Sequence, residues 1–204
     1  MVTIRRSVKY PESTDSYRIG QRPRVRVSIA DYGVGNLHSI RKALELAGAR
    51  PVVESNIDAA MRKLDGYRDI VLDRLNAGTP CLGICIGAQI LFEGSEEGEM
   101  PGLGLIKGRV VQLPAKRVPH MGWNEVRSDD RMFENVPSPY FYFAHSYCAR
   151  PEEDATRGTT DYEGEFPSVF RKKNVLGVQF HPEKSSASGA AFLRNYVKYL
   201  EEKL

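Results

Sequence analysis

Features that would place a protein outside the cell or in a membrane are missing from this sequence. Its 204 residues include only three cysteines, Cys81, Cys85 and Cys148, and their odd number and spacing suit neither a disulfide framework nor a zinc site. The start of the chain lacks the apolar core of a secretory signal, and no apolar stretch approaches the roughly 20 residues needed to cross a bilayer. We therefore expect a cytoplasmic protein with reduced thiols and no membrane contact.

A marked excess of charge is also missing. The formal net charge is +3, and the basic residues are dispersed apart from the arginine-rich first 24 residues, which argues against nucleic-acid binding. His38 and His120 have no metal-ligand spacing with the other histidines. The Gly-Val-Gly at residues 33–35 lacks the third glycine of a dinucleotide fingerprint. We expect neither a metal nor a cofactor.

The composition is that of an ordinary globular domain, with 41% hydrophobic and 27% charged residues. Residues 1–24 are polar and without periodicity, and we predict a flexible extension there, followed by one domain over residues 25–204. Strand and helix patterns alternate in the first half: strands at 25–30, 51–54 and 81–84, helices at 37–47, 59–76 and from 87. Ile70, Leu72 and Leu75 are candidate core residues of the second helix.

Short strand patterns dominate the second half of the chain. They occupy residues 104–113, 123–126, 140–143, 168–170 and 175–180, and a helical pattern at 188–201 closes the chain. Alternation followed by such strands predicts an α/β fold. We expect a mixed, mainly parallel sheet flanked by helices, with antiparallel strands in the second half.

The sequence Gly-Ile-Cys-Ile-Gly at residues 83–87 is the main candidate for chemistry. Small residues on both sides of Cys85 permit a sharp strand-to-helix turn that exposes the thiol, and the amide of Ile86 would then be the first oxyanion donor. Most unpaired cysteines are simply small buried hydrophobic residues, as we expect for Cys81. The flanking glycines and the following helix favour a nucleophile at Cys85.

The sequence Phe-His-Pro-Glu at residues 180–183 supplies a base and a carboxylate. His181 can take the thiol proton while Glu183 holds its other nitrogen, although a core histidine and a surface acid are the alternatives. No carboxylate follows His145 closely, so His181 is the preferred base. Gln89, one turn past Cys85, either touches the substrate or caps local backbone. We predict a cysteine acyl-transfer enzyme.

Residues 83–89 and 180–183 together resemble the class I glutamine amidotransferases. The strings Asp-Tyr-Gly-Val-Gly-Asn-Leu at 31–37, Pro-His-Met-Gly-Trp-Asn at 119–124 and Phe-Tyr-Phe-Ala-His-Ser-Tyr at 141–147 narrow this resemblance. They are similar to the glutaminase subunits of imidazole glycerol phosphate synthase. The resemblance runs from about Val25 to Leu200 and implies the fold of that class.

The resemblance implies a specific chemistry. Cys85 would attack the side-chain amide of glutamine, and His181, held by Glu183, would protonate the departing ammonia. Water activated by the same histidine would then hydrolyse the glutamyl thioester. The positions that match those holding the glutamine are Gly87, Gln89, His145, Ser146 and Tyr147.

The resemblance also implies a partner. Ammonia would pass to a cyclase subunit of (β/α)₈ type, in a heterodimer that makes imidazole glycerol phosphate and aminoimidazole carboxamide ribotide during histidine biosynthesis. The positions that match those facing this partner and its ammonia channel are Asn36, Trp123, Tyr142 and Lys184.

One departure from the family pattern lies near residues 55–60. Relatives carry a further strand there, ending in an oxyanion loop rich in proline and glycine, whereas this chain runs straight on. About 20 residues, enough for one strand and its loop, are missing by comparison. The alternatives that remain are a glutaminase subunit of another amidotransferase, a catalytically impaired binding subunit without its oxyanion strand, and, more weakly, a cysteine peptidase.

Overall fold

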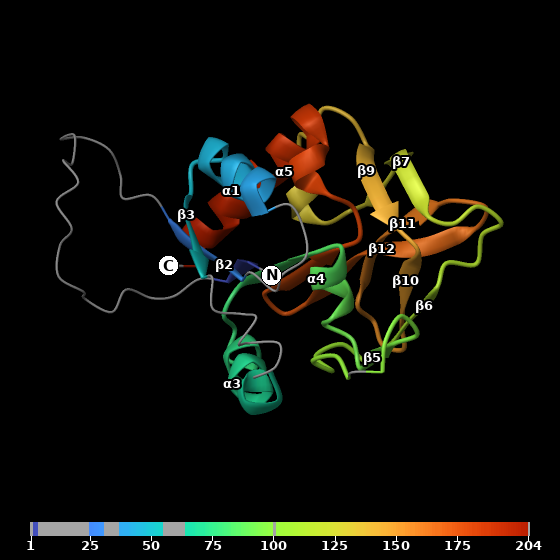
Figure 1. Ribbon diagram of the computed structural model, residues 1–204. Helices are drawn as coiled ribbons and strands as arrows, with labels where there is room; N and C mark the ends of the chain where they lie inside the picture. Colours follow the sequence, from blue (N-terminus) through green and yellow to red (C-terminus); the bar gives the residue numbers. More distant parts are fainter. Residues whose placement is uncertain (1, 4–24, 31–36, 55–63, 100, 204) are drawn as a thin grey trace, which may run out of the picture.

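An eight-stranded sheet forms the centre of the computed structural model, which describes residues 2–3, 25–30, 37–54, 64–99 and 101–203 (Figure 1). The strand order is β3-β2-β1-β4-β13-β12-β11-β8. The bounds are β1 Val2–Thr3, β2 Arg26–Ala30, β3 Arg50–Glu54, β4 Cys81–Ile84, β8 Arg127–Ser128, β11 Thr156–Asp161, β12 Glu165–Lys172 and β13 Val175–Val178.

The direction of the strands changes across this sheet. Strand β2 is parallel to β3, and β13 is parallel to β4, whereas β12, β11 and β8 continue the sheet in antiparallel fashion. Two smaller sheets complete the second half of the chain. One contains β5 Gly94–Ser95, β6 Gly108–Gln112 and β10 Tyr147–Pro151; the other pairs β7 His120–Glu125 with β9 Tyr140–His145. The predicted fold class, a mixed sheet flanked by helices with antiparallel strands in the second half, is confirmed. The expectation that the sheet is mainly parallel is wrong, because β2–β3 and β4–β13 are its parallel pairs and its other five described pairs are antiparallel.

Helices cover both faces of the central sheet. Helices α1 Leu37–Leu46 and α5 Ser186–Glu202 lie on one face, and α3 Leu64–Asn76 lies on the other (Figure 1). The one-turn helix α4 Ile86–Gln89 follows β4, and the short 3₁₀ helices are η1 Arg131–Phe133 and η2 Pro182–Lys184. No helix in the described part of the chain has both the length and the apolar character needed to cross a membrane.

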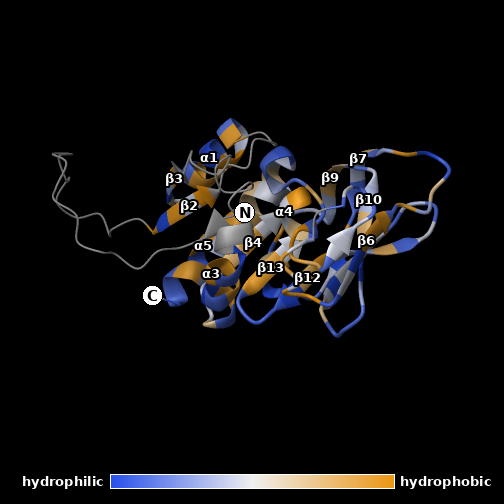
Figure 2. Ribbon diagram, turned by 60° about the horizontal axis from the view of Figure 1, so that its bottom comes forward, coloured by the Kyte–Doolittle hydropathy of each residue, from blue (hydrophilic) through white to orange (hydrophobic). Residues whose placement is uncertain are grey.

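The two faces of β4 and β13 explain how the core is divided. Leu82 on β4 and Val178 on β13 belong to the hydrophobic cluster that includes α5, whereas Cys81 and Val175 belong to the cluster on the opposite face. This alternation follows from the two-residue period of a strand. Strand β13 is hydrophobic along its length because both of its faces are covered (Figure 2).

The N-terminal strand β1 lies at an unexpected place. Val2 pairs with Ile29 of β2 and with Leu82 of β4, antiparallel to both, so the start of the chain fills the position between these strands. Residues 1 and 4–24, the rest of the predicted flexible extension, lie outside the described residues. The place near residues 55–60 where the further strand of the family is predicted to be missing also falls on undescribed residues, 55–63.

The described elements correct several details of the sequence-based prediction. Ile70, predicted as a core residue, is 48% exposed, whereas Leu75 is buried. The helix predicted over residues 59–76 is described from Leu64 onward, and the strand predicted from residue 104 begins only at Gly108, because Gly104 and Gly108 both have positive φ. Strands β5, β8, β10 and β11 were not predicted; β11 is polar, and its register shifts interrupt the simple alternation.

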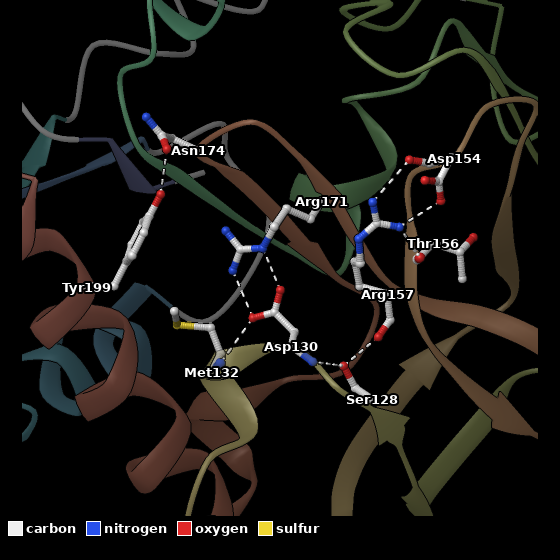
Figure 3. A network of polar contacts seen from close by, with 9 residues as sticks. All are labelled: Ser128, Asp130, Met132, Asp154, Thr156, Arg157, Arg171, Asn174 and Tyr199. Carbon is white, nitrogen blue, oxygen red and sulfur yellow. Dashed lines mark hydrogen bonds and ion pairs between the residues drawn. The ribbon is translucent and has the colours of Figure 1, made fainter.

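A polar network fastens η1 and α5 to strand β12 (Figure 3). Asp130 accepts hydrogen bonds from Arg171 Nη2 at 2.8 Å and from the backbone N–H of Met132 at 3.0 Å. The Arg171 guanidinium lies 5.6 Å from the centre of the Tyr199 ring, and the Tyr199 hydroxyl donates to Asn174 at 2.7 Å. Burial raises the pKa of Asp130, but its hydrogen bonds outweigh this effect and lower the pKa overall.

Candidate active site

Cys85 occupies a strained turn between β4 and α4. Its φ is +52° and its ψ −112°, a conformation that residues with a side chain rarely adopt. The backbone N–H of Cys85 donates to the carbonyl of Val178 at 2.8 Å, which fixes the turn to the end of the neighbouring strand. The side chain is partly exposed, whereas Cys81 and Cys148 are fully buried. The strained turn therefore exposes the thiol of Cys85 to solvent, whereas the other two thiols are buried.

Glycine is required at position 83 for this turn to close. A Cβ atom on Gly83 would lie 2.4 Å from the backbone oxygen of Gly87, too close for any real contact. Gly177, beside Gly83 on β13, has the same role more mildly, since its Cβ would lie 3.2 Å from Cβ of Ala88. The two glycines let α4 pack directly on the sheet, and this packing places Cys85 at the sheet's edge.

His181 and Glu183 lie just beyond the parallel neighbour of β4. The backbone N–H of His181 donates to the carbonyl of Tyr142 at 2.8 Å, and its Nδ1 lies 2.8 Å from Oε1 of Glu183. The Glu183 side chain is only 1% exposed and that of His181 15%. Pro182 begins the 3₁₀ helix η2, whose turn brings the carboxylate back to the imidazole.

Cys85 and Glu183 set the charge of His181. Burial alone would lower the pKa of His181 from its ordinary value of 6.5. The hydrogen bonds and charge interactions with Cys85 and Glu183 together outweigh burial and raise this pKa to about 9. Because Nδ1 is held by Glu183, Nε2 is the nitrogen that can exchange a proton with Cys85. The arrangement favours a charged imidazole beside the sulfur at neutral pH.

Helix α4 begins directly after Cys85. The first amides of a helix have no acceptor within it, so the N–H groups of Ile86 and Gly87 are the candidates to bind an anion that forms at Cys85. With only four residues, α4 contributes a small dipole, so single N–H groups count for more here than the helix as a whole.

His145 is not placed to act as the base. It is 6% exposed, and its Nδ1 lies 2.8 Å from the carbonyl oxygen of Tyr147 while its Nε2 lies 3.0 Å from Nδ1 of His120. Burial lowers the pKa of His145 to about 4; the hydrogen bond to Tyr147 opposes this shift and His181 adds to it. Both of its nitrogens are occupied by other groups, and it stays neutral.

Gln89 caps backbone in this structure rather than pointing to open space. Its Nε2 donates to the carbonyl of Tyr147 and to Oε1 of Gln179, both at 3.1 Å. Gln179, which the sequence analysis did not single out, is fully buried and donates from Nε2 to Sγ of Cys85 at 3.7 Å. A glutamine between Val178 and Phe180, directly after the apolar strand β13, was the signal that could have identified it.

The residues predicted to face a partner are partly brought together. Trp123 on β7 is the cross-strand partner of Tyr142 on β9, their rings lie 6.2 Å apart edge to face, and Lys184 Nζ lies 5.9 Å from the Tyr142 ring centre. Met121 and Tyr140 extend this surface, at 63% and 50% exposure. Asn36 lies outside the described residues, as does the stretch 55–63 that bears on the predicted loss of the oxyanion segment.

Comparison with known proteins is consistent with this geometry. The family Glutamine amidotransferase class-I matches residues 59–199. Imidazole glycerol phosphate synthase subunit HisH of Thermococcus kodakarensis is 45% identical over 191 residues, covering 83% of this chain and 98% of the relative. The HisH subunits of Pyrococcus furiosus and Methanocaldococcus jannaschii are 44% and 40% identical, over 84% and 85% of this chain and 97% and 100% of theirs.

Two solved structures share the fold. A crystal structure of a glutamine amidotransferase covers 86% of this chain and 98% of its own, with a TM-score of 0.62 and 20% identity. The crystal structure of a putative GMP synthase subunit from Thermoplasma acidophilum covers 90% of this chain and 99% of its own, with a TM-score of 0.65 and 19% identity. At these identities the likeness concerns the fold alone.

Proposed function

This chain belongs to the class I glutamine amidotransferases and, among them, to the HisH subunits of imidazole glycerol phosphate synthase, and we propose that it hydrolyses glutamine through Cys85, His181 and Glu183. The observation that carries the proposal is the 2.8 Å contact of His181 Nδ1 with Glu183, made where the same imidazole adjoins Cys85. A nucleophile, a base and an orienting carboxylate are thereby in one place.

The sulfur of Cys85 attacks the side-chain carbonyl carbon of glutamine. The carbonyl oxygen takes up the negative charge and accepts the N–H of Ile86. The proton held on His181 Nε2 passes to the amide nitrogen, the C–N bond breaks, and ammonia leaves a glutamyl thioester on Cys85. Water then gives a proton to the imidazole as its oxygen attacks the thioester, which releases glutamate and the thiolate. Glu183 holds the imidazole in one orientation through both steps.

Glutamine would lie between the turn at Cys85 and the segment that includes His145, Ser146 and Tyr147. Cys85 is linked to this segment through Gln179, Gln89 and the carbonyl of Tyr147. In this structure Gln89 is engaged with protein groups, so we propose that its contribution to glutamine binding comes through the position it gives to these neighbours.

We propose that the ammonia passes to a cyclase subunit of (β/α)₈ type in a heterodimer, which makes imidazole glycerol phosphate and aminoimidazole carboxamide ribotide. The surface formed by Met121, Trp123, Tyr140, Tyr142 and Lys184 supports this, since exposed aromatic side chains gathered on one face are typical of a protein interface. The channel for ammonia would open beside Asn36, Trp123, Tyr142 and Lys184. We propose that the complex acts in the cytoplasm, where reduced thiols persist.

A thiol-reactive glutamine analogue tests the catalytic assignment. We expect covalent labelling at Cys85, located by mass spectrometry of the digested protein, and no labelling in Cys85→Ala. The variant His181→Ala should lose labelling, whereas Cys148→Ala, at a buried thiol, should keep it. Glutamine hydrolysis should also rise when the cyclase subunit and its nucleotide substrate are added. A complex without glutaminase activity, with Cys85 still open to alkylation, would contradict the proposal.

A second function is favoured by one observation. No Pro-Gly-x-Gly string occurs before Cys85, so the second oxyanion donor of related glutaminases has no evident source in this chain. The alignment with the HisH subunit of Thermococcus kodakarensis is 191 positions long, but it includes only 83% of the 204 residues of this chain. Some positions of that relative therefore have no counterpart here. A catalytically impaired binding subunit fits this absence. Labelling at Cys85 that depends on His181 would argue against it.

A further inference from the structure

A buried row of hydrogen-bonded side chains runs from β7 to the nucleophile, and the position of its protons can be deduced. The carbonyl of Tyr147 can only accept, so Nδ1 of His145, 2.8 Å away, carries a hydrogen. The second nitrogen of the neutral ring, Nε2, then accepts. Its partner at 3.0 Å, Nδ1 of His120, is therefore the donor, and Nε2 of His120 is left as an acceptor.

Asn124 completes this order at the outer end. Its Nδ2 lies 3.3 Å from Nε2 of His120 and donates to the carbonyl of Asp161 at 2.8 Å, while its Oδ1 accepts the backbone N–H of Glu125 at 2.7 Å. The orientation of the amide is thus fixed by two backbone groups. Every hydrogen bond from Asn124 to Tyr147 has one donor and one acceptor, with both rings neutral.

Packing holds the two rings in this arrangement. His120 and His145 are cross-strand partners on β7 and β9, 2% and 6% exposed. The His120 ring is stacked between the rings of Phe143, at 4.7 Å, and Tyr162, at 3.9 Å. Burial, and to a lesser extent the interaction with His145, lowers the pKa of His120 to about 4. The ring is therefore neutral at neutral pH, as this arrangement of donors and acceptors requires.

The row continues from Tyr147 to the sulfur. The carbonyl of Tyr147 accepts a second hydrogen bond, from Gln89 Nε2 at 3.1 Å, and the other hydrogen of that amide goes to Oε1 of Gln179. Gln179 then has its Nε2 directed at Sγ of Cys85, at 3.7 Å. A donor at this end can hold the sulfur of Cys85 in place when it attacks glutamine as a thiolate. On its other side the same sulfur lies 3.9 Å from the carbonyl oxygen of Ala144.

We propose that His120, Asn124 and Gln179 are positioning residues for glutamine hydrolysis: the row Asn124–His120–His145 fixes the Tyr147 carbonyl, and through Gln89 it holds Gln179 as a donor to Cys85. The inference rests on the proposed function. None of the three needs to touch glutamine. Their effect is on the geometry of the thiolate and of the wall that faces it.

Two substitutions at His120 separate hydrogen bonding from packing. In His120→Phe a ring remains between Phe143 and Tyr162, but no donor faces His145. In His120→Asn the ring is lost, but the amide nitrogen lies near the place of Nδ1 and can still donate to Nε2 of His145. We expect kcat for glutamine to fall about 10- to 100-fold in His120→Phe, with a smaller change in KM, because a buried acceptor loses its partner. His120→Asn should recover most of this loss. Full activity in His120→Phe together with a large loss in His120→Asn would show that only packing matters, and would overturn the proposal.

A measurement on the unsubstituted protein does not depend on activity or on the folding of variants. Nitrogen-15 NMR of the histidine rings reports which nitrogen carries the hydrogen. We expect the Nδ1–H form for both His120 and His145, the less common form of a neutral histidine. An Nε2–H form at either ring would overturn the inference. A second measurement is the rate at which iodoacetamide alkylates Cys85. If both rings have the expected form and Gln179→Leu slows this alkylation, the positioning role is supported even where glutaminase activity is absent. Unchanged alkylation would contradict the last step, from Gln179 to Cys85.

Discussion

The backbone N–H of Cys85 donates to the carbonyl of Val178 at 2.8 Å, and this one hydrogen bond joins the proposed nucleophile to the strand that leads to the proposed base, His181. Strands β4 and β13 are parallel neighbours with Ile84 opposite Val178, so both chains leave the sheet at the same edge. Cys85 follows one strand directly and His181 follows the other after two residues. Side chains that approach each other in this way meet at the carboxyl edge of parallel strands, where ligands bind in open α/β sheets.

The tight contact at Gly83 predicts a large effect from a very small substitution. In Gly83→Ala the added Cβ would lie 2.4 Å from the backbone oxygen of Gly87, so the turn must move. We expect glutaminase activity to fall about 100-fold or more, since displacing a reacting group by about 1 Å can have this effect. Gly98→Ala is the matched control, because nothing lies within 4 Å of the added atom. Equal activity of the two variants would contradict the role given to Gly83.

The charge of His181 can be followed by NMR titration. With its pKa raised to about 9 by Cys85 and Glu183 against the effect of burial, the imidazole should keep its proton through neutral pH and lose it near pH 9. Glu183→Gln removes the carboxylate, so the pKa of His181 should fall and kcat should decrease about 10-fold or more. An unchanged titration curve in this variant would mean that Glu183 does not orient the ring.

The stability of the fold should decline on both sides of neutral pH. His120 and His145 have folded-state pKa values near 4, against 6.5 in the unfolded chain, so the unfolded state binds more protons and stability falls as the pH drops from about 6.5 to 4. His181 has the opposite sign: with its pKa raised to about 9, stability falls as the pH rises from about 6.5 to 9. Urea unfolding across this range measures both. Each unit of pKa shift corresponds to about 1.4 kcal/mol.

Two aspartates in Figure 3 should differ sharply in their importance for stability. The side chain of Asp130 is 3% exposed and pairs with Arg171, which is 18% exposed, so Asp130→Asn leaves a largely buried guanidinium without its counter-charge and should cost about 3 kcal/mol. Asp154 pairs with Arg157 at 2.9 Å but is 92% exposed, and Asp154→Asn should change the free energy of unfolding by less than about 1 kcal/mol. Chemical denaturation of both variants checks the difference. Similar losses of unfolding free energy in the two variants would show that burial of the aspartate does not determine the strength of its ion pair.

Strand β1 should be required for the integrity of the central sheet. It has β2 on one side and β4 on the other, so Thr3→Pro removes a backbone donor from a central strand and should lower the free energy of unfolding by about 1–3 kcal/mol. Thr3→Val, which keeps the N–H group and a β-branched side chain, should have little effect. If both variants unfold like the original chain, β1 does not support the sheet.

The parts of the site that depend on local sequence could be predicted, and those that depend on register could not. Glycines around Cys85, and a glutamate two residues after His181, are readable because the chemistry needs them at fixed short spacing. Gln179 and Cys85 meet only through the alignment of β13 with β4, and His120 meets His145 only because β7 and β9 pair in that register. Such alignments are set by the packed faces of whole strands, which no short motif encodes.

The same limit applies to the fold. The alternating first half and the antiparallel second half follow from hydrophobic periods, whereas β1 consists of two residues at the start of a polar stretch and carries no period. Ile70 was misjudged because its helix has a weakly hydrophobic face, so an apolar residue there can point to solvent without conflict.

The pairing of β4 with β13 has a consequence for protein synthesis. Cys81 lies opposite Val175, so the sheet edge that holds the thiol is finished only after nearly the whole chain has left the ribosome. A polypeptide still being translated carries Cys85 before it carries His181, so under the proposed mechanism it could not yet hydrolyse glutamine. If the proposed mechanism holds, glutaminase activity therefore requires β13 to have paired with β4.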